Sequence, residues 1–202
     1  MSAFDLRPLR VAIDLESVLA STHPYFINTY NDLYGTNHTT KDIDNWDWVR
    51  ETVDWKVFDG IVHGGWKNHP EKIKRQEEDA PEAFNRFANH EDIIVNIVTA
   101  RTGVKSEMER WLKTNGFTDH DGFLTTEMSK PKLGYDIYVD DNPTMPPKLK
   151  DNQLQYLIKG SHNRGVDSHD NVIELYRITT AIKDILTKYT KKENINISQQ
   201  QS

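Results

Sequence analysis

Short apolar runs alternate with amphipathic segments along most of the chain. The runs have the length and composition of buried strands and cover residues 9–14, 93–99, 122–125, 135–140 and 154–158. Continuous apolar runs of this kind are typical of parallel strands, which are buried on both faces. Amphipathic segments between them predict helices, so the pattern indicates an α/β fold with a parallel sheet covered on both faces.

Helical spacing and helix-end signals mark three segments. Residues 24–35 are predicted to form a helix with Pro24 in the first turn and Gly35 at its end. Apolar residues from 104 to 112 also follow helical spacing, and Gly116 supplies a stop. A third amphipathic helix is expected to begin directly after Asn171, with its apolar side formed by Ile173, Ile178, Ile182, Ile185 and Leu186.

Residues 20–88 show no strand pattern. Four of the five tryptophans lie there: Trp46, Trp48, Trp55 and Trp66. We expect a mostly helical insert, with two helical pieces parted at Pro81. The α/β core then comprises residues 1–19 and 89–190, and the polar tail 191–202 is predicted to be disordered.

Composition narrows the class of protein. The chain has 202 residues, enough for a substantial core, and a net charge of −6, which argues against nonspecific nucleic-acid binding. It has no cysteine, so disulfides, thiolate metal sites and a cysteine nucleophile are excluded. No apolar stretch approaches the roughly 18 residues of a membrane span, and no signal peptide is visible. We therefore expect a cytoplasmic protein with no membrane partner.

Polar residues follow the predicted strands at their carboxyl ends. Asp14 and Glu16 come after the first strand, Thr99 ends the strand at 93–99, and Asp140 and Asp141 end the strand at 135–140. In a parallel sheet these ends share one edge, where ligands bind. These side chains are therefore expected to lie in one small volume.

Four clustered carboxylates repel one another and remain ionised together only around a cation. All candidate ligands are oxygens, which favours a hard cation, Mg²⁺ above all. Lys130 lies just upstream of the second acid pair, and a lysine with a threonine hydroxyl and Mg²⁺ suits a phosphate group. Each feature alone has a structural explanation, such as a turn at Asp140–Asp141, so the prediction of phosphate chemistry rests on their joint order.

Four segments in this order resemble the motifs of the haloacid dehalogenase-like hydrolase superfamily. They are VAIDLESVL (11–19), IVTAR (97–101), Lys130 within TEMSKPK, and DIYVDDNP (136–143). The resemblance implies a Rossmann-like three-layer α/β/α core with a helical C1 cap inserted after the first motif, where residues 20–88 lie. The short length, TAR and DIYVDD look most like the 5′(3′)-deoxyribonucleotidase branch.

The resemblance also implies roles for these residues. Asp14 would be the nucleophile, and Glu16 the general acid and base. Thr99 and Lys130 would hold phosphoryl oxygens, with Lys132 as a rival to Lys130. Ala100 and Arg101 would join Thr99 and Lys130 in binding the substrate. Mg²⁺ would be bound by Asp14, the backbone carbonyl of Glu16, and Asp141, with Asp140 assisting.

The chain departs from the superfamily pattern at two adjacent positions. Glu16 stands where aspartate is usual and reaches about 1.5 Å further, and Ser17 stands where glycine is common. We nevertheless predict an active Mg²⁺-dependent phosphatase for a small phosphorylated metabolite, such as a (deoxy)nucleoside monophosphate. The alternative is a catalytically impaired protein of the same fold that binds phosphate ligands or a protein partner.

Further expectations concern the cap, the histidines and assembly. Most tryptophans of the insert are predicted to form the core of the cap, with one or two facing the cleft to stack on a base. His162 is interpreted as a solvated loop histidine. A homodimer is compatible with the sequence.

Overall fold

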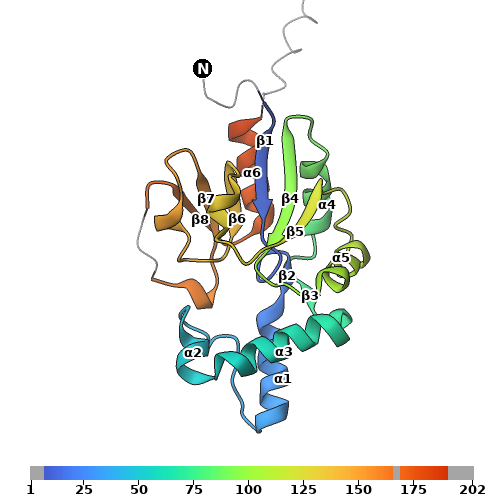
Figure 1. Cartoon of the computed structure of the whole chain (residues 1–202), viewed down its shortest axis with the longest axis vertical. Coiled ribbons are helices and arrows are strands. Elements are labelled where there is room, and N and C mark those ends of the chain that lie inside the picture. The colour runs from blue at the N-terminus through green and yellow to red at the C-terminus, as the bar shows by residue number, and fades with distance from the viewer. Residues whose placement is uncertain (1–6, 166–168, 191–202) are drawn as a thin grey trace, which may run out of the picture.

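A parallel six-stranded sheet forms the centre of the molecule. The computed structural model describes residues 7–165 and 169–190, and the tail predicted to be disordered lies outside these ranges. The strand order is β5-β4-β1-β6-β7-β8 (Figure 1). The strands are β1 (Leu9–Ile13), β4 (Ile93–Thr99), β5 (Gly122–Thr125), β6 (Ile137–Asp140), β7 (Leu154–Ile158) and β8 (Val172–Leu175). The predicted α/β class and parallel sheet are confirmed.

The two faces of the sheet are covered differently. On one face, Val11, Ile13 and their neighbours form the main core with α4 (Ala80–Ala88), α5 (Lys105–Thr114) and α6 (Ile178–Tyr189). Each such side chain, when fully buried, stabilises the fold by about 2 kcal/mol. On the other face, Ala12 and Tyr138 pack with Met145, and Leu133 and Leu149 lie against them. These last residues come from the short 3₁₀ turns η2 (Lys130–Leu133) and η3 (Pro146–Lys148) or from directly beside them, so the second helical layer is thin.

The insert forms a separate layer beyond the carboxyl edge of the sheet (Figure 1). It contains α1 (Thr22–Tyr34), α2 (Trp48–Thr52), α3 (Trp55–Asn68) and η1 (Pro70–Lys72). The chain enters it through β2 (Ala20–Ser21) and leaves through β3 (Lys74–Arg75), and these two strands pair antiparallel. α1 packs against α3 at Gly65, where any side chain would overlap the Tyr25 ring. We call β2 to β3 the cap.

Two expectations about the elements are wrong. The stretch after Asn171 first forms β8, which pairs with β7, and the helix begins only at Ile178. Pro81 lies in the first turn of α4 rather than between two helices, because proline needs no partner for its nitrogen there.

α4 lies within the range predicted to be cap, but it packs against α6 and β4 of the core. Phe84 and Phe87 on α4 are fully buried, and Phe84 contacts Phe117 edge to face.

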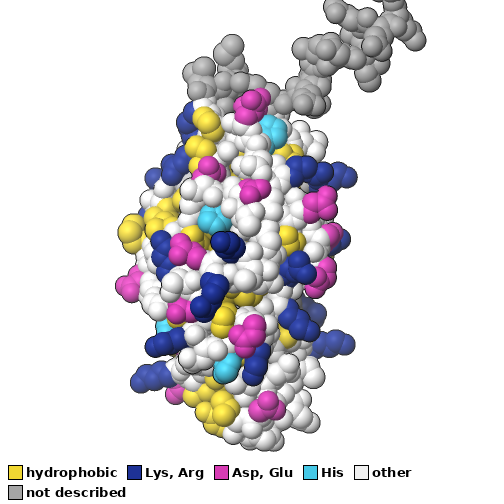
Figure 2. Space-filling model, turned by 90° about the vertical axis from the view of Figure 1, so that its right-hand side faces the viewer, with side chains coloured by type: hydrophobic (Ala, Val, Ile, Leu, Met, Phe, Trp, Pro, Cys, Tyr) yellow, Lys and Arg dark blue, Asp and Glu magenta, His cyan; other side chains and the backbone are white. Residues whose placement is uncertain are grey.

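No helix in the described part of the chain is long and apolar enough to span a membrane. On the face shown in Figure 2, acidic and basic side chains are interspersed.

Candidate active site

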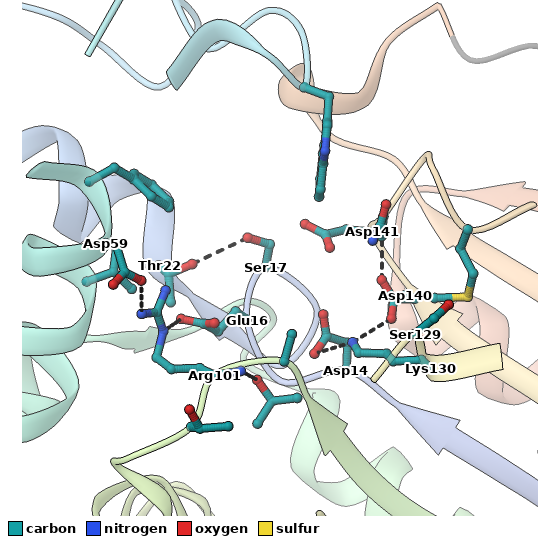
Figure 3. A pocket seen from close by; sticks show the side chains of 18 of the residues that line it. Asp14, Glu16, Ser17, Thr22, Asp59, Arg101, Ser129, Lys130, Asp140 and Asp141 are labelled. Atoms are coloured by element: carbon teal, nitrogen blue, oxygen red, sulfur yellow. Dashed lines mark hydrogen bonds and ion pairs between the residues drawn. The ribbon is translucent and has the colours of Figure 1, made fainter. Parts of the chain in front are cut away.

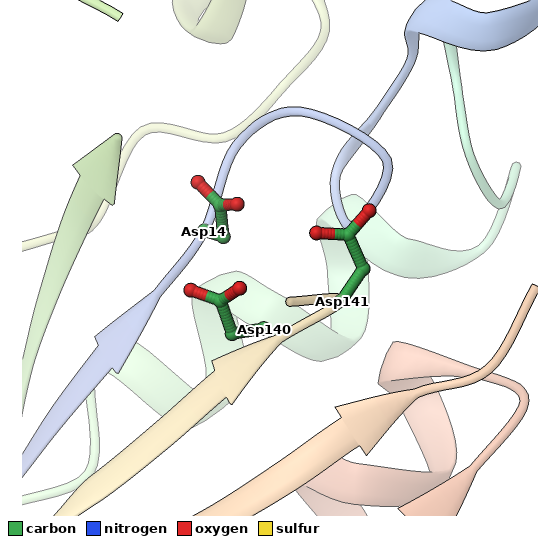
Figure 4. Close-up of side chains that lie close together, drawn as sticks. All are labelled: Asp14, Asp140 and Asp141. Atoms are coloured by element: carbon green, nitrogen blue, oxygen red, sulfur yellow. The ribbon is translucent and has the colours of Figure 1, made fainter. Parts of the chain in front are cut away.

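Three carboxylates converge at the carboxyl edge of the sheet. Asp14 directly follows β1, Asp140 ends β6, and Asp141 comes next (Figure 4). Because β1 and β6 are hydrogen-bonded neighbours, their ends bring these buried groups together. One oxygen from each carboxylate lies within 4.8 Å of the others. The strand ends thus meet as the sequence predicted.

Lys130 lies between two of these carboxylates (Figure 3). Its Nζ is 2.8 Å from Asp14 Oδ1 and 2.6 Å from Asp140 Oδ2. Its backbone carbonyl accepts a hydrogen bond from Tyr138, which holds η2 in place. Lys132 is exposed, and none of its contacts joins it to the acidic cluster in the part of the chain described. Of the two candidate lysines, Lys130 is therefore the one at the cluster.

Burial and mutual repulsion make the charged state of this cluster costly. Burial raises the pKa of Asp14 well above its ordinary value; Lys130 counteracts this, while Asp140 and Asp141 add to it. The pKa of Asp141 is also raised, by burial and then by Asp140. Burial opposes the charge on Lys130, but Asp14 and Asp140 outweigh it and raise the pKa of the lysine. The cluster has one cationic side chain for three carboxylates, so it fits a divalent cation bound through oxygen.

Thr99 ends β4 at the same edge of the sheet and is buried. Its hydroxyl accepts a hydrogen bond from the backbone N–H of Arg101. Thr99, Ala100 and Arg101 line one wall of a cleft between cap and core.

Glu16 points to the cap side of the cleft, away from the three aspartates (Figure 3). Its Oε1 accepts hydrogen bonds from Arg101 Nε at 2.8 Å and Trp66 Nε1 at 2.9 Å. The guanidinium of Arg101 also donates to Asp59 Oδ1 on α3, at 2.8 Å. The structure thus pairs Arg101 with two carboxylates at the border of the cap.

Ser17 adopts a backbone conformation that favours glycine. Its φ is 62°, in the left-handed region. The residue sits in the tight loop between β1 and β2, where Leu15 O accepts hydrogen bonds from the N–H groups of residues 19 and 20. Its hydroxyl lies 3.3 Å from that of Thr22 at the start of α1.

His162 is a site residue that the sequence interpretation missed. It is buried, not solvated, and its Nε2 lies 2.8 Å from Asp141 Oδ2. Burial lowers the pKa of His162 to about 4, so the ring is neutral near pH 7. The neighbouring Asn163 donates a hydrogen bond to the Asp141 carbonyl. A signal was available, because these residues follow β7, the strand next to β6 in the same sheet.

The cleft has a volume of about 680 Å³ and an aromatic side contributed by the cap. Trp46, Trp55 and Phe58 line it, while Trp48 and Trp66 are buried. Two of the four tryptophans thus face the cleft, as predicted, but the cap core takes only the other two rather than most of them. Asp14 and Lys130 lie on the opposite, core side, so a molecule in the cleft would contact both charged and aromatic groups.

A comparison with protein families gives a match over most of the chain. Residues 7–183 match the family described as 5′ nucleotidase, deoxy (pyrimidine), cytosolic type C protein. The chain belongs to this nucleotidase family. As a member of it, the protein is a haloacid dehalogenase-like hydrolase and a phosphoric monoester hydrolase. The comparison with curated proteins gives no match.

Solved structures share the fold of this nucleotidase-family protein at low sequence identity. A haloacid dehalogenase-like family hydrolase from Xanthomonas campestris is 11% identical with a TM-score of 0.54, over 91% of this chain and 98% of the other. A HAD-superfamily hydrolase of subfamily IA from Geobacter sulfurreducens PCA is 11% identical with a TM-score of 0.55, over 89% and 96%. A haloacid dehalogenase-like hydrolase from Bacteroides fragilis is 10% identical with a TM-score of 0.56, over 87% and 100%.

Proposed function

We propose that the protein is a Mg²⁺-dependent phosphatase that hydrolyses a small phosphomonoester by way of an aspartyl-phosphate on Asp14. The observation that carries this proposal is the placement of Asp14 beside Lys130 at the core side of the cleft, 2.8 Å apart. An aromatic wall opposite favours a (deoxy)nucleoside monophosphate as the substrate, because nucleobases stack on such side chains.

The acidic cluster fits the proposed cofactor. Asp14 and Asp141 would hold Mg²⁺ through carboxylate oxygens, together with the Glu16 carbonyl, and Asp140 would assist. Asp140 is oriented for this by the backbone N–H of Asn142 and by Lys130. When bound, Mg²⁺ supplies electrostatic stabilisation of the phosphoryl oxygens in the transition state.

The side chains of this chain divide the reaction into two steps. Asp14 attacks phosphorus while the bond to the leaving oxygen breaks, and Glu16 gives its proton to that oxygen. Glu16 then takes a proton from water, which attacks the phosphorus, releases inorganic phosphate and restores the Asp14 carboxylate. Lys130 and Thr99 would hold the phosphoryl oxygens in both steps.

A substrate panel tests the proposal. We expect the purified protein with Mg²⁺ to hydrolyse p-nitrophenyl phosphate and deoxynucleoside monophosphates, and Asp14→Asn to abolish turnover. With p-nitrophenyl phosphate, whose leaving group departs without a proton from Glu16, we expect Glu16→Gln to accumulate protein carrying one added phosphoryl group, detectable by mass spectrometry, because the water would lack its base. If wild type and Asp14→Asn are equally inert across the panel, the proposal fails and the alternative of a binding protein gains.

A further inference from the structure

We propose that Arg101 is a positioning residue for Glu16, and that Asp59 makes this positioning depend on a closed cap. The inference rests on the proposed function, in which Glu16 is the acid and base. It assigns to Arg101 a task other than contact with the substrate.

Glu16 is anchored through one oxygen. Arg101 and Trp66 both donate to Oε1, whereas no residue in the described part of the chain donates a hydrogen bond to Oε2. A glutamate has one more torsion than an aspartate, and that freedom must be lost before the carboxylate can act. Two donors on one oxygen remove the freedom and leave the other oxygen for proton transfer.

Arg101 is itself held from two sides. The side chain of Arg101 is only 10% exposed, between Glu16 at 20% and Asp59 at 50%. Different nitrogens of its planar guanidinium bind the two carboxylates, a geometry that a lysine ammonium does not reproduce. The three charges therefore form one connected unit at the border of the cleft (Figure 3).

This unit joins the core to the cap. Arg101 follows β4 of the core, whereas Asp59 and Trp66 both lie on α3 of the cap. Asp59 and Trp66 are seven residues apart, two helical turns, so they share the face of α3 that meets the core. Movement of α3 away from the core would break the contacts of both residues with Arg101 and Glu16.

The connection links proton transfer to exclusion of water. With the cap closed, Glu16 is anchored in the cleft. With α3 displaced, Glu16 loses its hydrogen bond from Trp66, and Arg101 loses its contact with Asp59. The acid would then be fully assembled only when bulk water is shut out, which protects the acyl phosphate from premature hydrolysis. The longer Glu16 side chain would be the feature that reaches this anchor.

Comparing substrates with different leaving groups tests whether Arg101 supports proton transfer by Glu16 or has only a structural role. A nucleoside leaves as a poor alkoxide and needs the proton from Glu16, whereas p-nitrophenolate leaves readily without it. For Arg101→Gln we expect kcat to fall about 100-fold on a deoxynucleoside monophosphate and less than about 10-fold on p-nitrophenyl phosphate, with KM nearly unchanged. If Arg101 instead bound the phosphate, KM would rise and both substrates would suffer equally, which would overturn the inference.

Asp59→Asn tests the link to the cap without leaving Glu16 unpaired. We expect a smaller loss of kcat on the nucleotide, and we expect that loss to disappear when Arg101→Gln is already present, since Asp59 acts through Arg101. Asp44→Asn, an exposed carboxylate elsewhere in the cap, is the matched control and should behave as wild type. Additive losses of Asp59→Asn and Arg101→Gln would contradict the proposed order of contacts.

Hydrogen exchange supplies a readout that needs no turnover. Asp59→Asn should speed amide exchange in α3 relative to wild type and Asp44→Asn, because the tie to the core is lost. Unchanged exchange in α3 would overturn the link to the cap. If the wild-type protein hydrolyses neither substrate, the role of Glu16 in chemistry falls with the proposed function, while the exchange experiment still decides whether Asp59 ties the cap.

Discussion

The loop after β1 places unusual residues at two successive positions, and each has a structural explanation. Glu16 finds two donors that a shorter aspartate would approach less closely. Ser17 takes a left-handed conformation, which costs a residue with a Cβ about 1–2 kcal/mol. The Ser17 hydroxyl offsets part of this cost by contacting the Thr22 hydroxyl at the start of α1.

Replacing Ser17 tests this account of the backbone. Ser17→Ala and Ser17→Gly both lose the hydroxyl, so they differ only in the Cβ at a φ of 62°. We expect the glycine variant to be more stable than the alanine variant by about 1 kcal/mol in urea unfolding. Glycine is normally the less stable of the two in regular structure, so the reversed order is the signature. Alanine as the more stable variant would show that the loop is not strained there.

At the scale of elements, α6 receives its N-terminal cap from a distant segment. Glu77 precedes α4, yet its Oε1 accepts from the Ile178 N–H at 2.6 Å and its Oε2 from the Thr179 hydroxyl at 2.8 Å. Arg177 donates to the same carboxylate. This contact fixes the first turn of α6 to the segment that leads into α4, and the two helices then pack together.

Glu77→Ala should therefore destabilise the fold by about 2 kcal/mol, the loss of a helix cap together with a buried charged acceptor. Urea unfolding with an unchanged m-value would measure it. Glu78→Ala is the control at the adjacent position, because Glu78 is 81% exposed and pairs with Arg75 at the surface; its effect should stay within about 0.5 kcal/mol. Equal effects at both positions would show that Glu77 does not cap the N-terminus of α6.

The elements that the sequence predicted are those whose signal is local. β1, β4 and β7 are continuous apolar runs, and Gly35 and Gly116 end helices with positive φ, as expected. β8 was missed because Ile173 also fits the apolar spacing of the following helix, and only pairing with β7 decides the matter. β2 and β3 have two residues each and exist only because residues more than 50 positions apart meet.

The same distinction holds within the candidate site. Asp14, Thr99 and Asp140 stand at strand ends, so topology alone brings them together. His162 also follows a strand, but its role depends on a turn that folds it back onto Asp141. The cap residues that contact Arg101 and Glu16 were beyond prediction. Asp59 reaches Arg101, and Trp66 reaches Glu16, only through the docking of α3 on the core.

At the scale of the whole molecule, the acidic cluster lowers the stability of the metal-free fold but provides the ligands for the proposed cofactor. Without a cation, Asp141 is buried beside Asp14 and Asp140, and among the described residues Lys130 is the one lysine or arginine that pairs with these carboxylates. Burial and Asp140 raise the pKa of Asp141, so its charged form costs folding free energy near neutral pH. Neutralising this residue should help the metal-free fold and remove what Mg²⁺ contributes.

Asp141→Asn is therefore expected to move stability in opposite directions with and without Mg²⁺. In EDTA the variant should be more stable than wild type by about 1 kcal/mol, since an amide keeps a hydrogen bond to His162 without the repulsion. Saturating Mg²⁺ should stabilise wild type by about 2–3 kcal/mol at a hundredfold excess over Kd and the variant far less, so the order reverses. Thermal unfolding in the two buffers measures both effects. Asp151→Asn, which neutralises an exposed carboxylate, is the control. Asp136→Asn is not suitable, because Asp136 pairs with Arg7. Equal Mg²⁺ stabilisation of wild type and Asp141→Asn would mean that the ion binds elsewhere, and the cluster would then be a strained acidic core rather than a cofactor site.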